Sequence, residues 1–172
     1  MKRIFDLLLS VVILILLVIP MLLISISVRL SSKGPALYWS NRIGRNNKIF
    51  KMPKFRSMLI NTPDIATHLL NAPDVYLSPI GGFLRSTSLD ELPQLFSVLR
   101  GDMSFVGPRP ALFNQEDLIA LRTEKGVDKL LPGITGWAQV NGRDELSIPD
   151  KVALDVEYLK RKSFWFDIKI GS

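Results

Sequence analysis

The chain has 172 residues with a formal net charge of +6, and 47% of its residues are apolar. It contains no Cys and a single His, His68, which excludes a disulfide framework, a thiolate nucleophile and the usual Cys/His zinc sites. The nucleotide-binding patterns G-x-G-x-x-G and G-x-x-x-x-G-K-[ST] are also absent. Catalysis would therefore have to use carboxylates, hydroxyls, cationic side chains or a metal ion held by oxygen atoms.

The first predicted element is a membrane segment, Leu7 to Val28, whose 22 residues carry no charge. As one straight helix it would be roughly 33 Å long, enough to cross a hydrocarbon core of about 30 Å. Pro20 divides this run, because proline lacks a backbone N–H and bends or breaks a helix. The rest of the chain has the apolar content of one soluble domain. We therefore predict a membrane element over residues 1–30 and a globular domain over residues 31–172.

The charges around the apolar run favour a hairpin over a span. Residues 1–60 carry ten Lys and Arg and one acid, a net charge of +9, whereas residues 61–172 carry twelve and fifteen, a net charge of −3. Basic residues mark the cytoplasmic side of a membrane, and here they flank the run on both sides. We expect a re-entrant helix-break-helix that enters one leaflet and returns, with Pro20 near the turn. The alternative is a kinked single-pass signal anchor, and both topologies leave the domain in the cytoplasm.

The basic cluster after the apolar run fits a surface that faces anionic lipid headgroups, so we do not expect nucleic-acid binding. Strand-like pieces at residues 36–39 and 48–50 are predicted within a loop-rich connection, followed by an exposed, irregular excursion over residues 61–79. Helices are predicted near residues 93–99, 115–125 and 149–162. These elements predict a mostly helical α/β fold.

The last predicted element combines basic and aromatic residues over 160–166. It suits an amphipathic helix in the headgroup region, and a buried aromatic cluster is the alternative. The sequence stops within an apolar pattern, so we expect a shortened chain whose residues 171–172 remain from cloning.

Asp90 and Glu91 form the most informative pair of carboxylates. The simplest interpretation is a capping box, Ser88-x-x-Glu91, at the start of a helix. The same position beside Arg85 favours ionised carboxylates, which can act as a nucleophile, a base or a Mg²⁺ ligand.

Two glycine-rich stretches follow the carboxylate pair. In residues 101–110, Arg109 lies between two prolines that would present its guanidinium for bidentate phosphate contact, although a solvated Arg on a structural turn is the alternative. In residues 132–143, Trp137 or Arg143 would contact a base or phosphate, and a tight hairpin with a core Trp is the alternative.

Five motifs occur in a characteristic order, namely Lys2–Asp6, Lys54–Met58, Ser88–Leu95, Gly101–Pro110 and Pro132–Arg143. In this order the chain resembles the bacterial sugar transferases that are monotopic phosphoglycosyl transferases, in the small form that contains only the catalytic domain. The resemblance covers nearly the whole chain. It implies transfer of a phospho-sugar from a UDP-sugar to polyprenyl (undecaprenyl) phosphate, which gives a polyprenyl-diphosphate-sugar and UMP. This reaction is the first membrane step of glycoconjugate biosynthesis.

The same resemblance implies roles for individual residues. Asp90 would attack the β-phosphorus to form a covalent phospho-sugar intermediate, with Mg²⁺ as cofactor and Asp90 as a metal ligand. Glu91 would assist the acceptor phosphate. Arg85 and Arg109 match phosphate-binding positions. Four further residues match positions for substrate binding or support, namely Lys54, Arg56, Arg143 and Asp155.

The resemblance also implies a location at the bacterial inner membrane, monotopic, with the catalytic domain on the cytoplasmic face. A Ser-Pro break is usual in this family, whereas this chain has Ile19-Pro20. Inner-membrane lipid is an expected partner, and the oligomeric state is left open, with a dimer as one option. The alternative outside enzymes is a membrane-surface scaffold that binds anionic lipid, in which Asp90 and Glu91 only cap a helix.

Overall fold

The computed structural model describes residues 2–60, 62–63 and 73–172. His68 and most of the predicted excursion over residues 61–79 lie outside these residues. The helices are α1 (Lys2–Ser31), α2 (Gly81–Ser86), α3 (Gln94–Arg100), α4 (Glu116–Glu124), α5 (Trp137–Val140), α6 (Ile148–Arg161) and α7 (Phe164–Gly171), and the strands are β1 (Leu37–Ile43), β2 (Ile49–Phe55), β3 (Ser104–Val106) and β4 (Gly133–Thr135). The prediction of a mostly helical α/β fold is confirmed, as are the helices at α3, α4 and α6.

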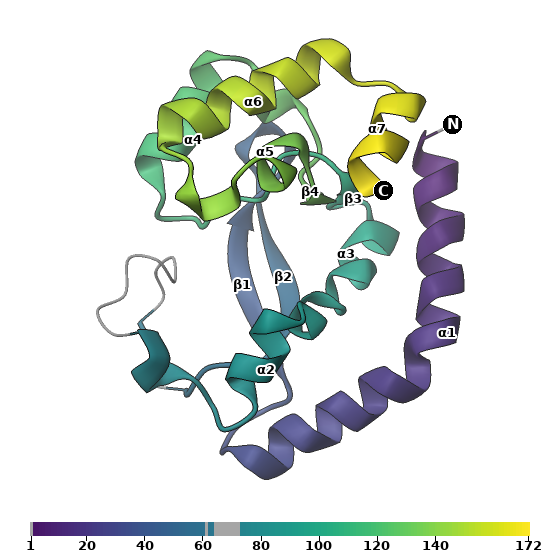
Figure 1. The fold of residues 1–172 in the computed structure, drawn as a ribbon, viewed down its shortest axis with the longest axis vertical. Coiled ribbons are helices and arrows are strands. Elements are labelled where there is room, and N and C mark those ends of the chain that lie inside the picture. Colours follow the sequence, from purple (N-terminus) through teal and green to yellow (C-terminus); the bar gives the residue numbers. More distant parts are fainter. Residues whose placement is uncertain (1, 61, 64–72) are drawn as a thin grey trace.

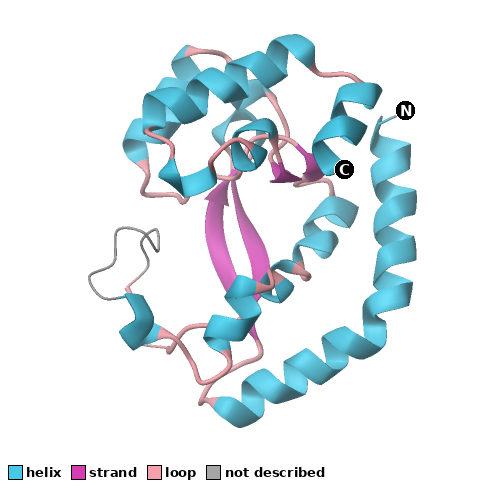
Figure 2. Ribbon diagram, in the orientation of Figure 1, coloured by secondary structure: helices cyan, strands magenta, loops and turns pink. Residues whose placement is uncertain are grey.

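Short 3-10 turns connect several of these elements: η1 (Arg45–Asn47), η3 (Pro73–Tyr76), η4 (Leu89–Glu91), η5 (Val127–Lys129) and η6 (Arg143–Glu145). The long β1–β2 hairpin runs through the middle of the molecule, with α4, α5 and α6 gathered at one end and α2 at the other (Figure 1). Helix α3 lies between the hairpin and α1 (Figure 2). The chain therefore wraps helices around a narrow two-stranded ribbon.

The strand-like pieces predicted at residues 36–39 and 48–50 are confirmed, since they overlap the beginnings of β1 and β2. The loop-rich connection predicted around them is wrong, because both strands continue into a long hairpin. Seven residues of β1 pair antiparallel with seven of β2, from Leu37 opposite Phe55 to Ile43 opposite Ile49. Phe50 and Met52 are buried on one face of β2, where they pack against α3 and the start of β3. In β1 the buried residue is the polar Ser40, and in β2 the adjacent residues Met52 and Pro53 are both buried. Neither strand therefore shows a period-two pattern of apolar residues in the sequence.

Helix α1 is one continuous helix, so the predicted break at Pro20 is not present. The helix contains Pro20 and bends between two arms that enclose one side of the molecule (Figure 1). Proline removes one helical hydrogen bond and displaces the preceding turn, which accounts for a bend without interruption. An 18-residue window of α1 has a mean hydropathy of 3.4, and 11% of it is buried. The helix is therefore long and apolar enough to cross a membrane by length and composition.

Both ends of α1 contact the globular part. Near the N-terminus, the Asp6 carboxylate accepts a 2.6 Å hydrogen bond from Ser104, and Lys2 Nζ lies 2.6 Å from Asp167. The Arg3 guanidinium donates to the last carbonyls of α3. Near the C-terminus, Val28 is fully buried against β2 and α2. Most apolar side chains along the helix, including those in its middle, remain exposed.

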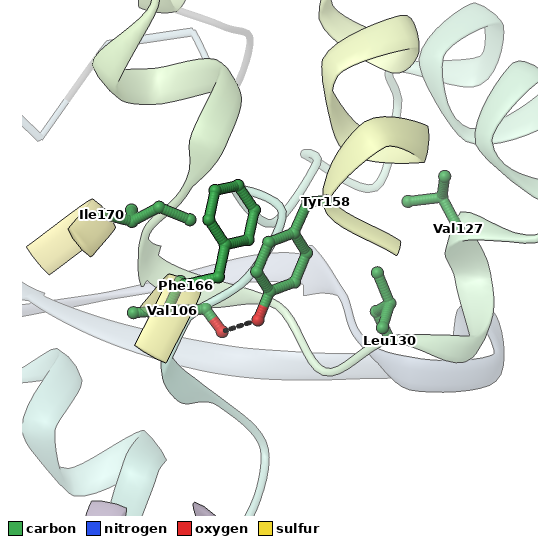
Figure 3. Packing of buried hydrophobic residues seen from close by; sticks show 6 residues of the cluster. All are labelled: Val106, Val127, Leu130, Tyr158, Phe166 and Ile170. Carbon is green, nitrogen blue, oxygen red and sulfur yellow. Dashed lines mark hydrogen bonds between the residues drawn. The ribbon is translucent and has the colours of Figure 1, made fainter. Parts of the chain in front are cut away.

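A separate apolar cluster joins α6 and α7 to β3 and η5. Six residues form it, namely Val106, Val127, Leu130, Tyr158, Phe166 and Ile170 (Figure 3). The Tyr158 hydroxyl donates to the Asp167 carboxylate at 2.8 Å, and it lies 3.4 Å from the Val106 carbonyl oxygen. In α7, Phe166 is buried, whereas Phe164 and Trp165 are exposed. Phe166 thus belongs to a buried aromatic cluster, whereas the location of α7 in the headgroup region stays a prediction.

Candidate active site

The carboxylate pair lies in the 3-10 turn η4, immediately before α3. Ser88 precedes the turn in a left-handed conformation, with φ of 58°, and its side chain makes no capping hydrogen bond. Helix α3 begins at Gln94, three residues after Glu91. The predicted capping box is therefore wrong, because Ser88 and Glu91 are not the first residues of a helix. Asp90 and Glu91 are held in a separate turn.

Lys54 faces both carboxylates from the end of β2. Its Nζ atom lies 3.9 Å from Asp90 Oδ2 and 3.9 Å from Glu91 Oε1. The Lys54 side chain is 13% exposed and that of Asp90 is 6% exposed. The ammonium group therefore covers the two carboxylates at close range in a largely desolvated setting.

Arg109 contacts the pair from a third segment. Its Nη2 atom donates to Glu91 Oε1 at 3.3 Å. Arg85, in the last turn of α2, is close enough for its charge to act on Asp90. Four segments that are separate in sequence, α2, β2, η4 and the turn around Arg109, thus bring three cations to two carboxylates.

The pKa values of these groups move in different directions. Burial raises the pKa of Asp90, and the charge of Lys54 opposes this effect only in part. Burial also acts to raise the pKa of Glu91, but the charges of Arg109 and Lys54 outweigh it, so the pKa is lowered. Burial, together with the charge of Arg109, lowers the pKa of Lys54 to about 8. Environments that separate the pKa values of two neighbouring carboxylates are typical of catalytic pairs.

A cavity of about 300 Å³ opens beside these groups. Among its described lining residues, the charged ones are all cationic, namely Arg42, Lys54, Arg56, Arg85, Arg109, Arg122 and Lys151. Lys54 and Arg109, which contact the two carboxylates, belong to the lining of this cavity. A space of this size and charge suits a ligand that carries more than one phosphate.

The two glycine-rich stretches serve backbone packing. A Cβ atom on Gly133 would lie 2.1 Å from the Gly107 nitrogen, and one on Gly136 would lie 2.1 Å from the Gly107 oxygen. Glycine at these positions lets the parallel strands β3 and β4 and the following turn approach closely. The alternative of a tight hairpin over residues 132–143 is wrong, because this stretch forms β4 and α5. Trp137 packs against the core, and its indole N–H donates to Glu157.

The other predicted site residues lie in different settings. The Arg56 guanidinium donates to Ser32 and to the Pro35 carbonyl, so it ties the segment after α1 to the end of β2. Asp155 is 2% exposed and accepts from Arg122 Nε at 2.9 Å. Arg143 is exposed, and its charge acts on Glu91. The contacts of Arg56 and Asp155 are those of supporting residues.

The sequence reasoning missed three cationic side chains of the cavity wall, Arg42, Arg122 and Lys151. They come from β1, α4 and α6 respectively. None of them lies in the five motifs or next to another candidate residue. For Arg122 the sequence gives one indirect signal. Its buried partner Asp155 was among the predicted site residues, but nothing in the sequence shows that the two residues pair.

Comparison with known proteins gives the chain a family. A family model described as bacterial sugar transferase matches residues 1–171. An undecaprenyl-phosphate glucose phosphotransferase of Komagataeibacter xylinus is 43% identical over 98% of this chain and 34% of that protein. A UDP-glucose:undecaprenyl-phosphate glucose-1-phosphate transferase of Escherichia coli is 41% identical over 99% of this chain and 38% of that protein.

A relative of similar size also exists. An uncharacterised sugar transferase of Bacillus subtilis, EpsL, is 42% identical over 99% of this chain and 83% of that protein. By contrast, the chain spans only about a third of the length of the K. xylinus and E. coli proteins. The match over residues 1–171 includes α1, the carboxylate pair and the cavity alike. The chain belongs to the bacterial sugar transferase family.

Proposed function

We propose that this protein transfers a phospho-sugar from a UDP-sugar to polyprenyl phosphate, which yields a polyprenyl-diphosphate-sugar and UMP. The observation that carries the proposal is the Asp90–Glu91 pair, with Lys54 and Arg109 in contact, beside a cavity whose described charged residues are all cationic. Donor diphosphate and acceptor phosphate are both anions, so their approach requires such a cationic surface. The names of two relatives, which pair UDP-glucose or glucose with undecaprenyl phosphate, support the same reaction.

In the first half-reaction, a carboxylate oxygen of Asp90 attacks the β-phosphorus of the donor. The bond from this phosphorus to the UMP oxygen breaks, and UMP leaves with the electron pair. Burial raises the pKa of Asp90 and makes its carboxylate more basic than an exposed one. Arg85 and Arg109 bind the phosphate oxygens, and Lys54 offsets the negative charge beside Asp90.

In the second half-reaction, an oxygen of polyprenyl phosphate attacks the phosphorus held on Asp90. The Asp90–phosphorus bond breaks and the carboxylate is restored. Glu91 stays ionised, because Arg109 and Lys54 lower its pKa, and it orients the acceptor phosphate or accepts a proton from it. The two carboxylates thus have successive roles in a ping-pong sequence.

The side chains fit a Mg²⁺ ion in part. Asp90 offers carboxylate oxygen, which Mg²⁺ prefers, but no group of three or more His, Cys, Asp or Glu occurs among the described residues. Asp90 would therefore hold the ion together with substrate phosphates and water, as is usual for Mg²⁺ in phosphoryl transfer. When bound, the ion would neutralise phosphate charge. With the ion bound, the roles given above for the two carboxylates, Lys54 and the two arginines stay the same.

We further propose that α1 is a re-entrant membrane element, so that the protein is monotopic with its domain on the cytoplasmic face of the inner membrane. One globular part contacts both ends of α1, through Lys2 and Asp6 at one end and Val28 at the other. A helix that crossed the bilayer would separate these ends by the membrane thickness. The exposed middle of α1 would lie in lipid, and the acceptor's phosphate would lie near the headgroup level.

The nucleotide product tests the proposed reaction. With purified protein, polyprenyl phosphate, Mg²⁺ and a panel of UDP-sugars, we expect release of UMP. UDP release would indicate an ordinary glycosyl transfer instead. Asp90→Asn should abolish UMP release, whereas Asp117→Asn, on the exposed side of α4, serves as the matched control. Full activity of the Asp90 variant would refute the role of Asp90 as nucleophile.

A further inference from the structure

The turn that carries Arg109 has an unusual set of hydrogen-bond requirements. Pro108 and Pro110 have no N–H, so this segment offers mainly carbonyl oxygens to its surroundings. Buried carbonyls need donors, and a segment without them is free to shift. The Pro108 carbonyl accepts from the Gly133 N–H at 2.9 Å, which ties it to β4.

Two arginines supply the donors for the next two carbonyls. Arg122 Nη1 donates to the Arg109 carbonyl at 2.7 Å, and Arg42 Nη1 donates to the Pro110 carbonyl at 3.1 Å. The turn is thus tied on one side to β4 and on the other to α4 and β1. Each bond goes to a backbone atom, so it fixes where the Arg109 side chain begins.

Both arginines are themselves fixed by a second contact. Arg122 Nε donates to the buried Asp155 carboxylate at 2.9 Å, and the Arg122 side chain is 10% exposed. Arg42 Nε donates to the hydroxyl of Ser40, a residue that is 1% exposed. A planar guanidinium with two directed bonds has little freedom to move, and lysine offers no such fork.

The held turn positions the Arg109 guanidinium, whose Nη2 atom donates to Glu91 Oε1 at 3.3 Å. We propose that Arg42 and Arg122 are positioning residues, which act on the reaction by holding the Pro108–Pro110 turn and so aiming Arg109 at Glu91 and the phosphate. This inference rests on the proposed function for its catalytic consequence. Asp155 joins the same assembly as the residue that orients Arg122.

A double-mutant cycle tests this assignment. Arg42→Gln and Arg122→Lys are suitable variants, because neither leaves the buried Asp155 without a cation. We expect each to lower kcat for UMP release by about ten- to a hundredfold, with KM for the UDP-sugar changed less than about threefold, since small misplacements of a catalytic group carry losses of this size. In an Arg109→Gln background, the same changes should cause less than about a twofold further loss.

Additive losses in the Arg109→Gln background would overturn the proposal, because they would mean that Arg42 and Arg122 act on the substrate directly. A rise in KM with unchanged kcat would overturn it for the same reason. Lys129→Gln provides the control, since Lys129 is 71% exposed and pairs only with its neighbour Asp128 among the described residues. It should leave both constants unchanged.

Amide hydrogen exchange provides a readout that needs no activity. The backbone N–H groups of Gly133 and Ile43 donate to the Pro108 and Ala111 carbonyls, which lie on either side of the two held carbonyls. They should exchange at least about tenfold faster in Arg42→Gln and Arg122→Lys than in the wild type or in Lys129→Gln, because the ties on the turn are lost. Unchanged exchange would overturn the proposal. Absence of UMP release by the wild type would refute the proposed function, while the exchange result would still decide whether the two arginines hold the turn.

Discussion

Lys54 is the side chain on which the charge balance of the candidate site depends most directly. It lies at equal distance from the two carboxylates and close enough to Arg109 to be affected by that charge. Burial disfavours its charged form, and the carboxylates favour it. The site thus keeps a cation that is easily neutralised next to the proposed nucleophile.

The pH dependence of the free energy of unfolding should reveal the burial of Lys54. The pKa of Lys54 is about 8 in the folded state, against 10.5 ordinarily, so between these values the unfolded chain binds one more proton. The free energy of unfolding should therefore rise with pH in this window, by roughly 1.4 kcal/mol per pH unit at most. We expect the wild type to gain stability relative to Lys54→Met from pH 8 to pH 10 in thermal unfolding without divalent cations. A constant difference would contradict the burial of a charged Lys54.

A change at Glu91 should impair the second half-reaction and leave the first one intact. Because Asp90 rather than Glu91 attacks the donor, Glu91→Gln should still release up to one UMP per protein molecule in a single turnover. Lipid-linked product should form at least about a hundredfold more slowly, a loss typical of a missing general base. Rapid-quench measurement of both products would show this, with Glu116→Gln in the exposed first turn of α4 as control. Equal loss of both products would contradict the division of roles.

Sequence reasoning identified the residues that gather at the site better than those that support it. Asp90, Glu91, Arg85 and Arg109 lie in short motifs whose residue types suggest phosphate chemistry, and they do come together. Arg42 and Arg122 lie outside these motifs, and their contacts with the Arg109 turn are to backbone carbonyls. Contacts of this kind depend on the fold and leave no pattern in a single sequence.

At the scale of elements, the error over Ser88 to Glu91 has a clear physical origin. The spacing fits a capping box, but Ser88 adopts a left-handed conformation, and Pro93 occupies the residue before α3. A capping box at Ser88 would start the helix at Leu89, five residues before Gln94, where α3 begins. What remained hidden was a separate turn that carries the two carboxylates as its last residues.

Helix α1 provides a test of membrane topology. A cysteine added before residue 1 and Lys33→Cys should both be protected from an impermeant maleimide in intact cells, and both should react after permeabilisation, since the chain has no native Cys. Reaction of only one from outside would refute the re-entrant arrangement. Both sites flank α1 and lie outside its apolar run.

The bend at Pro20 should be required for this topology. In Pro20→Leu a straight helix with 22 uncharged residues is long enough to span the bilayer. We expect the added N-terminal cysteine to become reactive from outside in this variant, whereas the matched change Val18→Leu should leave it protected. Continued protection in Pro20→Leu would show that the contacts of Lys2, Arg3 and Asp6 hold the end of α1 without the proline.

At the scale of the whole molecule, α1 is part of the domain rather than a detachable anchor. It covers Phe55 and Leu84 near its C-terminal end and Ser104 near its N-terminal end. A protein that lacks residues 1–31 should therefore expose apolar surface, unfold at a lower temperature and aggregate, as size-exclusion chromatography would show. Leu16→Ala, at a side chain that is 72% exposed, should leave the folded domain unchanged. A stable, monomeric truncated protein would contradict this view.

The contacts of Lys2 impose an order on how the protein is made. Lys2 donates to the Tyr158 hydroxyl, 156 residues further along the chain. At usual rates of translation this partner leaves the ribosome roughly 8 to 30 s after Lys2. Throughout that interval the N-terminal end of α1 lacks these protein partners. The attachment of the N-terminus to α6 is therefore among the last steps of folding.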